Sequence, residues 1–270
     1  MKQILIARSG VKLVDWSIQD KHPWSPDERR RFWEAVHVRG DYESIWSVTE
    51  EEHMLDQIAA ALKLSGSEVA RALIPGAGTR TLLERHLVDE FPGLSIVATD
   101  FPEVARKASS TFQHPRVEYI ARDSTDLGWK DEFDFVLPVN STVSERHSEN
   151  IQMLDSMLEA LRPNGRLVGL FPTVIATLDI ASVMRSQAQF KRVDLERSSV
   201  CESDGVEQIF YSPLRLRQLC REVGFSLERM EIVFFESDRA RQESSAHYSI
   251  DADADLVVYE LLVTARRAVA

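Results

Sequence analysis

The stretch Ile74-Pro75-Gly76-Ala77-Gly78-Thr79-Arg80 lies between an apolar run over 69–74 and an amphipathic segment of helix length. Two glycines one residue apart let a backbone turn sharply and approach a ligand with no Cβ in the way. The helix that follows offers free N–H groups at its N-terminus. The stretch therefore predicts a ligand-binding loop between a strand and a helix, with a turn that only needs glycine as the plainer alternative.

Outward from this loop, apolar runs of strand length alternate with amphipathic segments of helix length. The five runs are VARALI (69–74), LSIVATD (94–100), RVEYIA (116–121), FDFVLPV (133–139) and GRLVGLF (165–171). Most are continuous rather than alternating, as expected for parallel strands buried on both faces. Two later runs, 228–235 and 255–265, have no helix between them, which predicts an antiparallel pair. We expect an α/β fold with a seven-stranded, mostly parallel, doubly wound sheet whose last strand is antiparallel.

The first 65 residues differ from the rest in composition. They hold four of the five tryptophans and show no sheet pattern, while helices are expected near 26–38 and 48–63. We expect residues 1–65 to form a helical cap on a Rossmann-like domain over 66–270. The stretch 172–210, which follows the fifth strand, is interpreted as an insertion that adds to the cap.

Composition and charge narrow the choice of partners. The 270 residues carry a formal net charge of −11, which repels phosphate backbones and anionic membranes. No apolar run approaches the roughly 20 residues needed to span a bilayer, and two isolated cysteines suit a reducing compartment. We expect a cytoplasmic monomer or homodimer that acts on a small molecule, without nucleic acid or membrane as a partner.

Polar residues follow the second and third strands where each strand ends. Asp100 lies 24 residues after Gly76 and can accept hydrogen bonds from both hydroxyls of a ribose. Arg122-Asp123-Ser124 ends the third strand, where an adenine amino group could bind. Open α/β sheets bind ligands at these carboxyl ends, so the pattern predicts a nucleoside site. Thr81, in place of the third glycine of the dinucleotide fingerprint, argues mildly against NAD.

From 69 to 265 the chain resembles the class I S-adenosylmethionine (SAM)-dependent methyltransferases. IPGAGTR resembles the first motif of that family, ATD the second, ARDSTDL the adenine-side motif and FDFVLPVNS the fourth. MLEALRPNGRLVGL and YSPLRLRQLCREVGFSLERME are similar to its later helix-and-strand segments. The chain departs from the family at Ile74, where an acidic residue is usual, at Arg80, where a third glycine is usual, and in lacking the Asn/Asp-Pro-Pro-Tyr box.

The resemblance implies SAM as cofactor and a small-molecule acceptor, in secondary metabolism. The cofactor-binding residues it implies are Pro75, Gly76, Ala77, Gly78, Asp100, Phe101, Asp123, Ser124 and Asn140. The candidate catalytic residues are Asn140, Ser141 and His147, which follow the fourth strand. An Asn amide can accept a hydrogen bond from a neutral amine, and a His near neutrality can act as a base. Each has a plain alternative: Asn140 as a turn residue, and His147 as a surface residue in the first turn of a helix that Ser144 caps.

Alternatives remain at this point. Some relatives of this fold break a different bond of SAM, in aminobutyrate transfer or cyclisation to azetidine-2-carboxylate with release of methylthioadenosine. A catalytically silent SAM-binding protein would keep the same loop, and NAD-dependent redox chemistry is a further alternative. No metal is expected, because the spacing of the histidines at 22, 37 and 53 matches no metal set.

Overall fold

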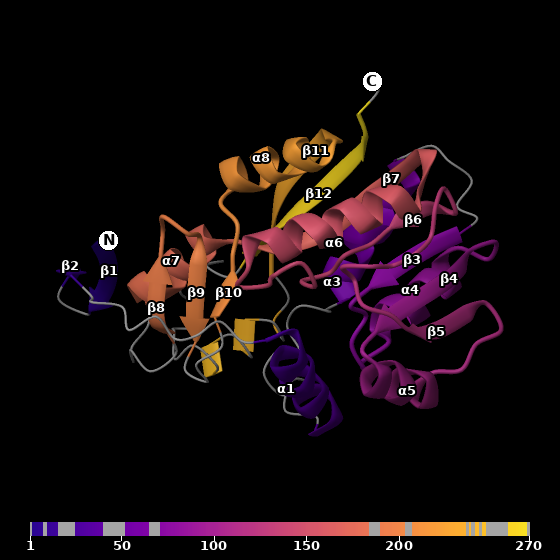
Figure 1. Cartoon of the computed structure of the whole chain (residues 1–270), viewed down its shortest axis with the longest axis horizontal. Helices are drawn as coiled ribbons and strands as arrows, with labels where there is room; N and C mark the ends of the chain where they lie inside the picture. Colours follow the sequence, from indigo (N-terminus) through magenta and orange to yellow (C-terminus); the bar gives the residue numbers. More distant parts are fainter. Residues whose placement is uncertain are drawn as a thin grey trace.

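The computed structural model describes residues 2–7, 10–15, 25–39, 52–64, 71–183, 190–202, 207–235, 238, 241–242, 245–246 and 259–268. A seven-stranded sheet lies at its centre, in the order β11-β12-β7-β6-β3-β4-β5 (Figure 1). Its strands are β3 (Arg71–Pro75), β4 (Ser95–Asp100), β5 (Val117–Ala121), β6 (Phe133–Val136), β7 (Leu161–Pro172), β11 (Phe225–Phe234) and β12 (Tyr259–Arg267). The strands β7, β6, β3, β4 and β5 are parallel, and β12 is antiparallel to both β7 and β11. The predicted sheet, including the antiparallel last strand, is confirmed.

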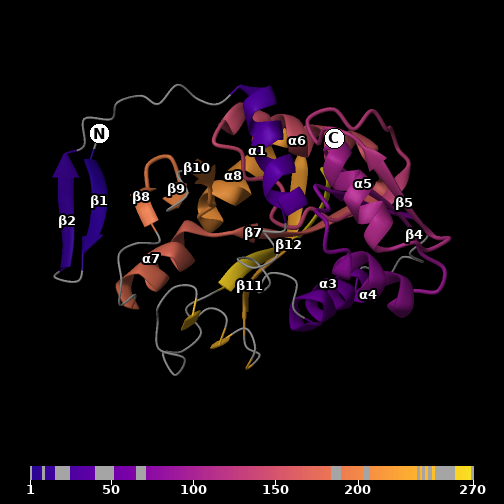
Figure 2. The ribbon, with the colours of Figure 1, turned by 90° about the horizontal axis from the view of Figure 1, so that it is seen from below.

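Helices bury both faces of this sheet (Figure 2). On one face α3 (Glu52–Leu64) and α4 (Leu82–Glu90) share a core with Ala72 and Ile74 of β3. On the other face α6 (His147–Ala160) and α8 (Pro213–Val223) share a core with Leu73. Neighbouring residues of β3 thus enter opposite cores, which is why the run that forms this strand is continuously apolar. Among the described helices, none combines the length and the apolar character needed to cross a membrane.

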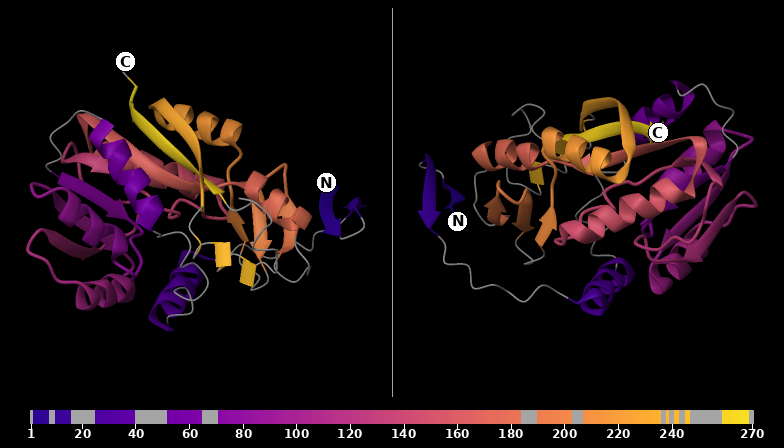
Figure 3. Two further views of the ribbon diagram at one scale, coloured as in Figure 1. Left: turned by 180° about the vertical axis from the view of Figure 1, so that it is seen from behind. Right: turned by 45° about the horizontal axis from the view of Figure 1, so that its top comes forward.

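A second sheet joins the N-terminus to the insertion. Its order is β10-β9-β8-β1-β2, formed by β1 (Lys2–Ala7), β2 (Gly10–Asp15), β8 (Phe190–Asp194), β9 (Ser199–Glu202) and β10 (Glu207–Ile209). The insertion also contains α7 (Val174–Val183), and Figure 3 shows the N-terminal hairpin at this end of the molecule. The expectation of no strands in the first 65 residues is therefore wrong, because β1 pairs with β2 and also meets β8 at Ile4 and Val193.

The helical part of the N-terminal prediction matches the described segments. The helix expected near 26–38 is α1 (Pro26–Arg39), and the helix expected near 48–63 is α3. Three of the four N-terminal tryptophans lie outside the described residues, and Trp33 lies on α1. The division into a cap over 1–65 and a domain over 66–270 stays a prediction.

Close backbone contact holds the centre of the sheet to the loop after β6. A Cβ built on Gly169 of β7 would lie 2.8 Å from the carbonyl oxygen of Pro138 and 2.9 Å from the Phe171 ring. By contrast, a Cβ built on Gly93, in the turn before β4, would meet nothing within 4 Å. The absence of a side chain is therefore structurally required at Gly169 and not at Gly93.

We expect Gly169→Ala to lower the free energy of unfolding by about 1–3 kcal/mol, because the methyl group can be accommodated only by moving backbone. Gly93→Ala is the matched control and should leave stability unchanged or raise it by up to about 1 kcal/mol. Urea unfolding followed by circular dichroism measures both. Equal midpoints for the two variants would contradict the packing described.

Candidate functional site

The glycine loop between β3 and α4 is built from left-handed backbone. Gly76 has φ +66° and Gly78 φ +69°, both in the region that favours glycine. Thr81, buried and with φ +60°, precedes the first residue of α4. The N–H of Ala77 donates to the carbonyl of Thr99 over 3.0 Å, which ties the loop to the end of β4. The chain thus makes a tight left-handed turn at the carboxyl end of the sheet, as the sequence predicts.

Asp100, at the end of β4, fixes the next loop against the first. Its two carboxylate oxygens accept hydrogen bonds from the N–H of Gly78 at 2.9 Å and the N–H of Phe101 at 2.7 Å. Burial raises the pKa of Asp100 to about 6; the two backbone hydrogen bonds act in the opposite direction, and nearby Glu34 raises it further. Each oxygen keeps a further lone pair, so the carboxylate can still accept from a ligand.

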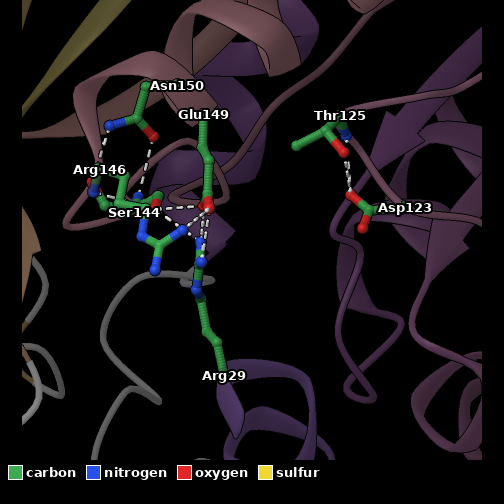
Figure 4. A network of polar contacts seen from close by, with 7 residues as sticks. All are labelled: Arg29, Asp123, Thr125, Ser144, Arg146, Glu149 and Asn150. Carbon is green, nitrogen blue, oxygen red and sulfur yellow. Dashed lines mark hydrogen bonds and ion pairs between the residues drawn. The ribbon is translucent and has the colours of Figure 1, made fainter. Parts of the chain in front are cut away.

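The adenine-side residues predicted after β5 form a turn of their own. Asp123 accepts hydrogen bonds from the N–H of Thr125 at 2.9 Å and from its hydroxyl at 2.8 Å. Asp123 is exposed and the adjacent Ser124 is half-buried. Figure 4 shows Asp123 and Thr125 across from the contacts made after β6. These residues lie at the third strand end, separate from the Asp100 carboxylate.

Asn140 and Ser141 follow β6 and contact both the glycine loop and the last strand. Asn140 has φ +51°, a conformation that Asn tolerates better than most residues, and its N–H donates to the carbonyl of Leu170 over 3.0 Å. Its side-chain Nδ2 donates to Oε1 of Glu260 on β12 over 2.7 Å. A Cβ built on Gly76 would lie 2.5 Å from Cβ of Ser141, so the two loops touch.

Glu260 was missed by the sequence analysis. It is 5% exposed, within the core of the sheet, and burial raises its pKa to about 8 while the Asn140 hydrogen bond offsets only part of that shift. A signal was available, because Glu260 is the one charged residue of the apolar run 256–265. Buried carboxyl groups need a partner or a function to offset the cost of leaving water.

His147 is the first residue of α6 and contacts α8. Its Nε2 lies 3.0 Å from Nη2 of Arg215, and burial together with that guanidinium lowers its pKa. The predicted capping by Ser144 is wrong, since Arg146 is the N-cap residue and the Ser144 hydroxyl instead accepts from the N–H of Arg146 at 3.2 Å. His147 thus contacts Arg215, and the role of His147 as a base stays a prediction.

Helix α1 lies against the glycine loop, held at both ends. At one end the two terminal guanidinium nitrogens of Arg29, Nη1 and Nη2, bind Glu149, and Nη1 also donates to the Ser144 hydroxyl over 2.6 Å (Figure 4). At the other end Lys107 of α5 (Pro102–Thr111) donates to the carbonyl of His37 over 2.8 Å. A Cβ built on Gly78 would lie 3.3 Å from Cε1 of His37, so α1 covers the loop. The sequence analysis did not identify this role of α1, because the partners of Arg29 and His37 lie 120 and 70 residues away in the chain.

The predicted residues therefore fall into three places. Gly78 is hydrogen-bonded to Asp100, and Ser141, at the next strand end, contacts Gly76 of the same loop. The adenine-side pair lies after β5, and His147 lies against α8. The first place combines a turn of glycine backbone without Cβ atoms, a buried carboxylate and polar side chains at the carboxyl ends of strands, where open α/β sheets bind ligands.

Comparison of the whole fold with solved structures identifies its architecture. The chain aligns with 1,6-didemethyltoxoflavin-N1-methyltransferase of Burkholderia thailandensis over 95% of its length and 94% of that chain, with a TM-score of 0.60 and 18% identity. It aligns with magnesium protoporphyrin IX methyltransferase of Synechocystis PCC 6803 over 90% and 100%, with a TM-score of 0.60 and 13% identity. The chain has the class I SAM-dependent methyltransferase fold.

Other comparisons agree on this methyltransferase fold or give no match. Human N-acetylserotonin methyltransferase aligns over 91% of this chain and 57% of its own, with a TM-score of 0.51 and 13% identity. No protein-family model and no curated protein sequence matches the chain. At these identities the comparisons establish the methyltransferase fold, and the chemistry has to be argued from the site.

We expect Arg29→Met to loosen α1, because the largely buried Glu149 loses its bidentate partner and is left with the longer ion pair to Arg146 at 3.7 Å. The loss should be about 2 kcal/mol of unfolding free energy, with faster amide exchange over 26–39. Arg30→Met is the matched control, since Arg30 pairs with Asp27 at the surface, where the side chains are 46% and 67% exposed, and should change stability by no more than about 1 kcal/mol. Hydrogen–deuterium exchange measures both, and equal protection of α1 in the two variants would contradict this anchoring role.

Proposed function

We propose that the protein is a SAM-dependent methyltransferase that acts on a small-molecule acceptor. The observation that carries the proposal is the Asp100 carboxylate, buried at the end of β4 and hydrogen-bonded to the Gly78 N–H of the glycine loop. A carboxylate that could accept from ribose hydroxyls thus lies beside a glycine loop at the strand ends of the methyltransferase fold, which supports the proposal.

The residues present fit the parts of SAM. Backbone at Gly76 and Gly78 carries no Cβ, so the methionine part can approach it closely. The remaining lone pairs of Asp100 would accept from the ribose hydroxyls, and Asp123 with Ser124 would lie on the adenine side. SAM supplies an electrophilic methyl group on a sulfonium, and the chain has to align and desolvate the acceptor.

The named neighbours support a small-molecule acceptor. The Burkholderia enzyme was crystallised with 1,6-didemethyltoxoflavin and S-adenosylhomocysteine, and the Synechocystis enzyme with S-adenosylhomocysteine. Negative net charge disfavours nucleic acid as the acceptor. We also propose a cytoplasmic location, because two isolated cysteines suit a reducing compartment, and a role in secondary metabolism, as the resemblance implies.

The test of the function is which fragment of SAM the protein releases. We expect S-adenosylhomocysteine, formed only when a pool of cell metabolites is added, and a product heavier by one methyl group; labelled methyl SAM and mass spectrometry identify both. Methylthioadenosine released without an acceptor would select cyclisation instead, and methylthioadenosine that needs an acceptor would select aminobutyrate transfer. Unchanged SAM with measurable binding would indicate a silent SAM-binding protein.

We expect the affinity for S-adenosylhomocysteine to fall as the pH drops below about 6. The pKa of Asp100 in the free protein is about 6, and ribose hydroxyls that donate to the carboxylate favour its charged form. Below that pH binding must first remove a proton, so the affinity loses up to about tenfold per pH unit.

Calorimetry from pH 5 to 8 measures this dependence. Asp100→Asn should bind more weakly at neutral pH and lose the dependence, because the amide does not titrate. Asp89→Asn, on the exposed side of α4, is the matched control and should behave as wild type. A pH dependence that survives in Asp100→Asn would show that another group is responsible.

A further inference from the structure

Three buried polar atoms beside the glycine loop have no hydrogen-bond partner within the described part of the chain. They are Oε2 of Glu260, Oδ1 of Asn140 and Oγ of Ser141. Buried polar atoms are nearly always hydrogen-bonded, because each unpaired one costs free energy. Three such atoms on residues that touch one another or are adjacent in the chain indicate a site prepared for a ligand.

The three residues connect the glycine loop with the last strand of the sheet. Ser141 packs on Gly76. Asn140, the residue before Ser141, donates a hydrogen bond from its amide nitrogen to Glu260 over 2.7 Å. In this hydrogen bond the amide nitrogen of Asn140 is the donor, so the amide oxygen, Oδ1, is still available as an acceptor. When Glu260 is ionised, all three atoms can therefore accept a hydrogen bond, and the Ser141 hydroxyl can also donate one.

Among the described residues, the cross-strand neighbours and the hydrogen-bond partner of Glu260 are uncharged. On β12 it lies between Pro172 of β7 and Val233 of β11, and it faces Asn140 of the loop after β6. None of these three side chains titrates. The hydroxyl of the neighbouring Tyr259 is engaged elsewhere, as it donates to Asp179 over 2.6 Å. A proton taken up by Glu260 would thus be held in a largely apolar environment.

We propose that Glu260 and Asn140 bind the N–H or O–H group of the methyl acceptor, and that Glu260 receives the proton which this group loses. The inference rests on the proposed methyltransferase function and names the acceptor class: a neutral nitrogen or oxygen nucleophile that carries hydrogen. Hydrogen bonds to the two side-chain oxygens would turn the lone pair of the nucleophile away from them.

The step balances in atoms and charge. The sulfur–methyl bond of SAM breaks with its electron pair staying on sulfur, which becomes a neutral thioether. The acceptor forms the new bond to the methyl carbon with its lone pair and becomes positively charged. Its proton then passes to the Glu260 carboxylate, which becomes a carboxylic acid and later releases the proton to solvent. Because burial keeps this carboxyl protonated up to a pH of about 8, the rate should rise with pH through that range.

The first experiment tests binding without turnover. Protein with ¹³C-labelled glutamate carboxyl groups is saturated with S-adenosylhomocysteine and titrated with imidazole, aniline and phenol as N–H and O–H probes. The Glu260 signal is assigned by its absence in Glu260→Gln. We expect at least one probe to shift this signal. Binding of S-adenosylhomocysteine with no shift from any probe would overturn the proposal and leave the methyltransferase function standing.

The second experiment separates a chemical role from a structural one. With labelled SAM and the responding probe as acceptor, Glu260→Gln should keep the affinity for S-adenosylhomocysteine within twofold, lower kcat at least 100-fold at pH 8, and lose the rise of rate with pH. Thr264→Val, which removes a buried hydroxyl on the same face of β12, is the matched control and should keep the wild-type rate and pH profile.

The remaining outcomes of these experiments also test the proposed role of Glu260 or the proposed function. Loss of S-adenosylhomocysteine affinity in Glu260→Gln, with thermal stability unchanged, would assign Glu260 to the cofactor and overturn the proposal. Full activity of Glu260→Gln would show that Glu260 has only a structural role and would overturn the proposal. Failure of the wild-type protein to bind S-adenosylhomocysteine at all would contradict the proposed function itself.

Discussion

The site depends on one side chain that joins two strand ends. By accepting from the N–H groups of Gly78 and Phe101, Asp100 sets the loop after β3 and the start of α5 in one position relative to each other. A carboxylate can do this because it has two oxygens with several lone pairs, and backbone N–H groups at turns have no partner within a helix or sheet. The cost is a buried charge, which the raised pKa of Asp100 reflects.

Much of the fold could be predicted from the sequence, since its strongest signals are local. Most of the runs that become β3 to β7 are continuous and apolar because both sheet faces are covered, and Gly76 and Gly78 have the left-handed backbone expected of the loop after β3. The antiparallel pairing of β11 and β12 was predicted correctly, although the expectation of no helix between them does not hold for residues 238, 241–242 and 245–246, which are helical. The position of Asp100 at a strand end likewise followed from spacing alone.

Contacts between distant segments of the chain could not be predicted from the sequence. The hairpin β1–β2 joins β8 and Arg29 meets Glu149, pairings about 190 and 120 residues apart in the chain that no local pattern specifies. Glu260 is a different case, since a single carboxyl in an apolar strand is visible in the sequence. That Asn140, 120 residues earlier, is its hydrogen-bond partner cannot be seen in the sequence. Chemistry that arises from such pairs becomes apparent only when the sheet order is known.

The place of β12 also has a kinetic consequence. It follows β11 in the chain yet lies between β11 and β7, so β11 cannot join the sheet until β12 has paired with β7. That pairing closes a loop of about 90 residues, which is slow compared with local contacts. Until then β7 presents an open, apolar edge of the kind that associates with other chains. During synthesis this protein should therefore depend on chaperones until Glu260 and the rest of its final strand have left the ribosome.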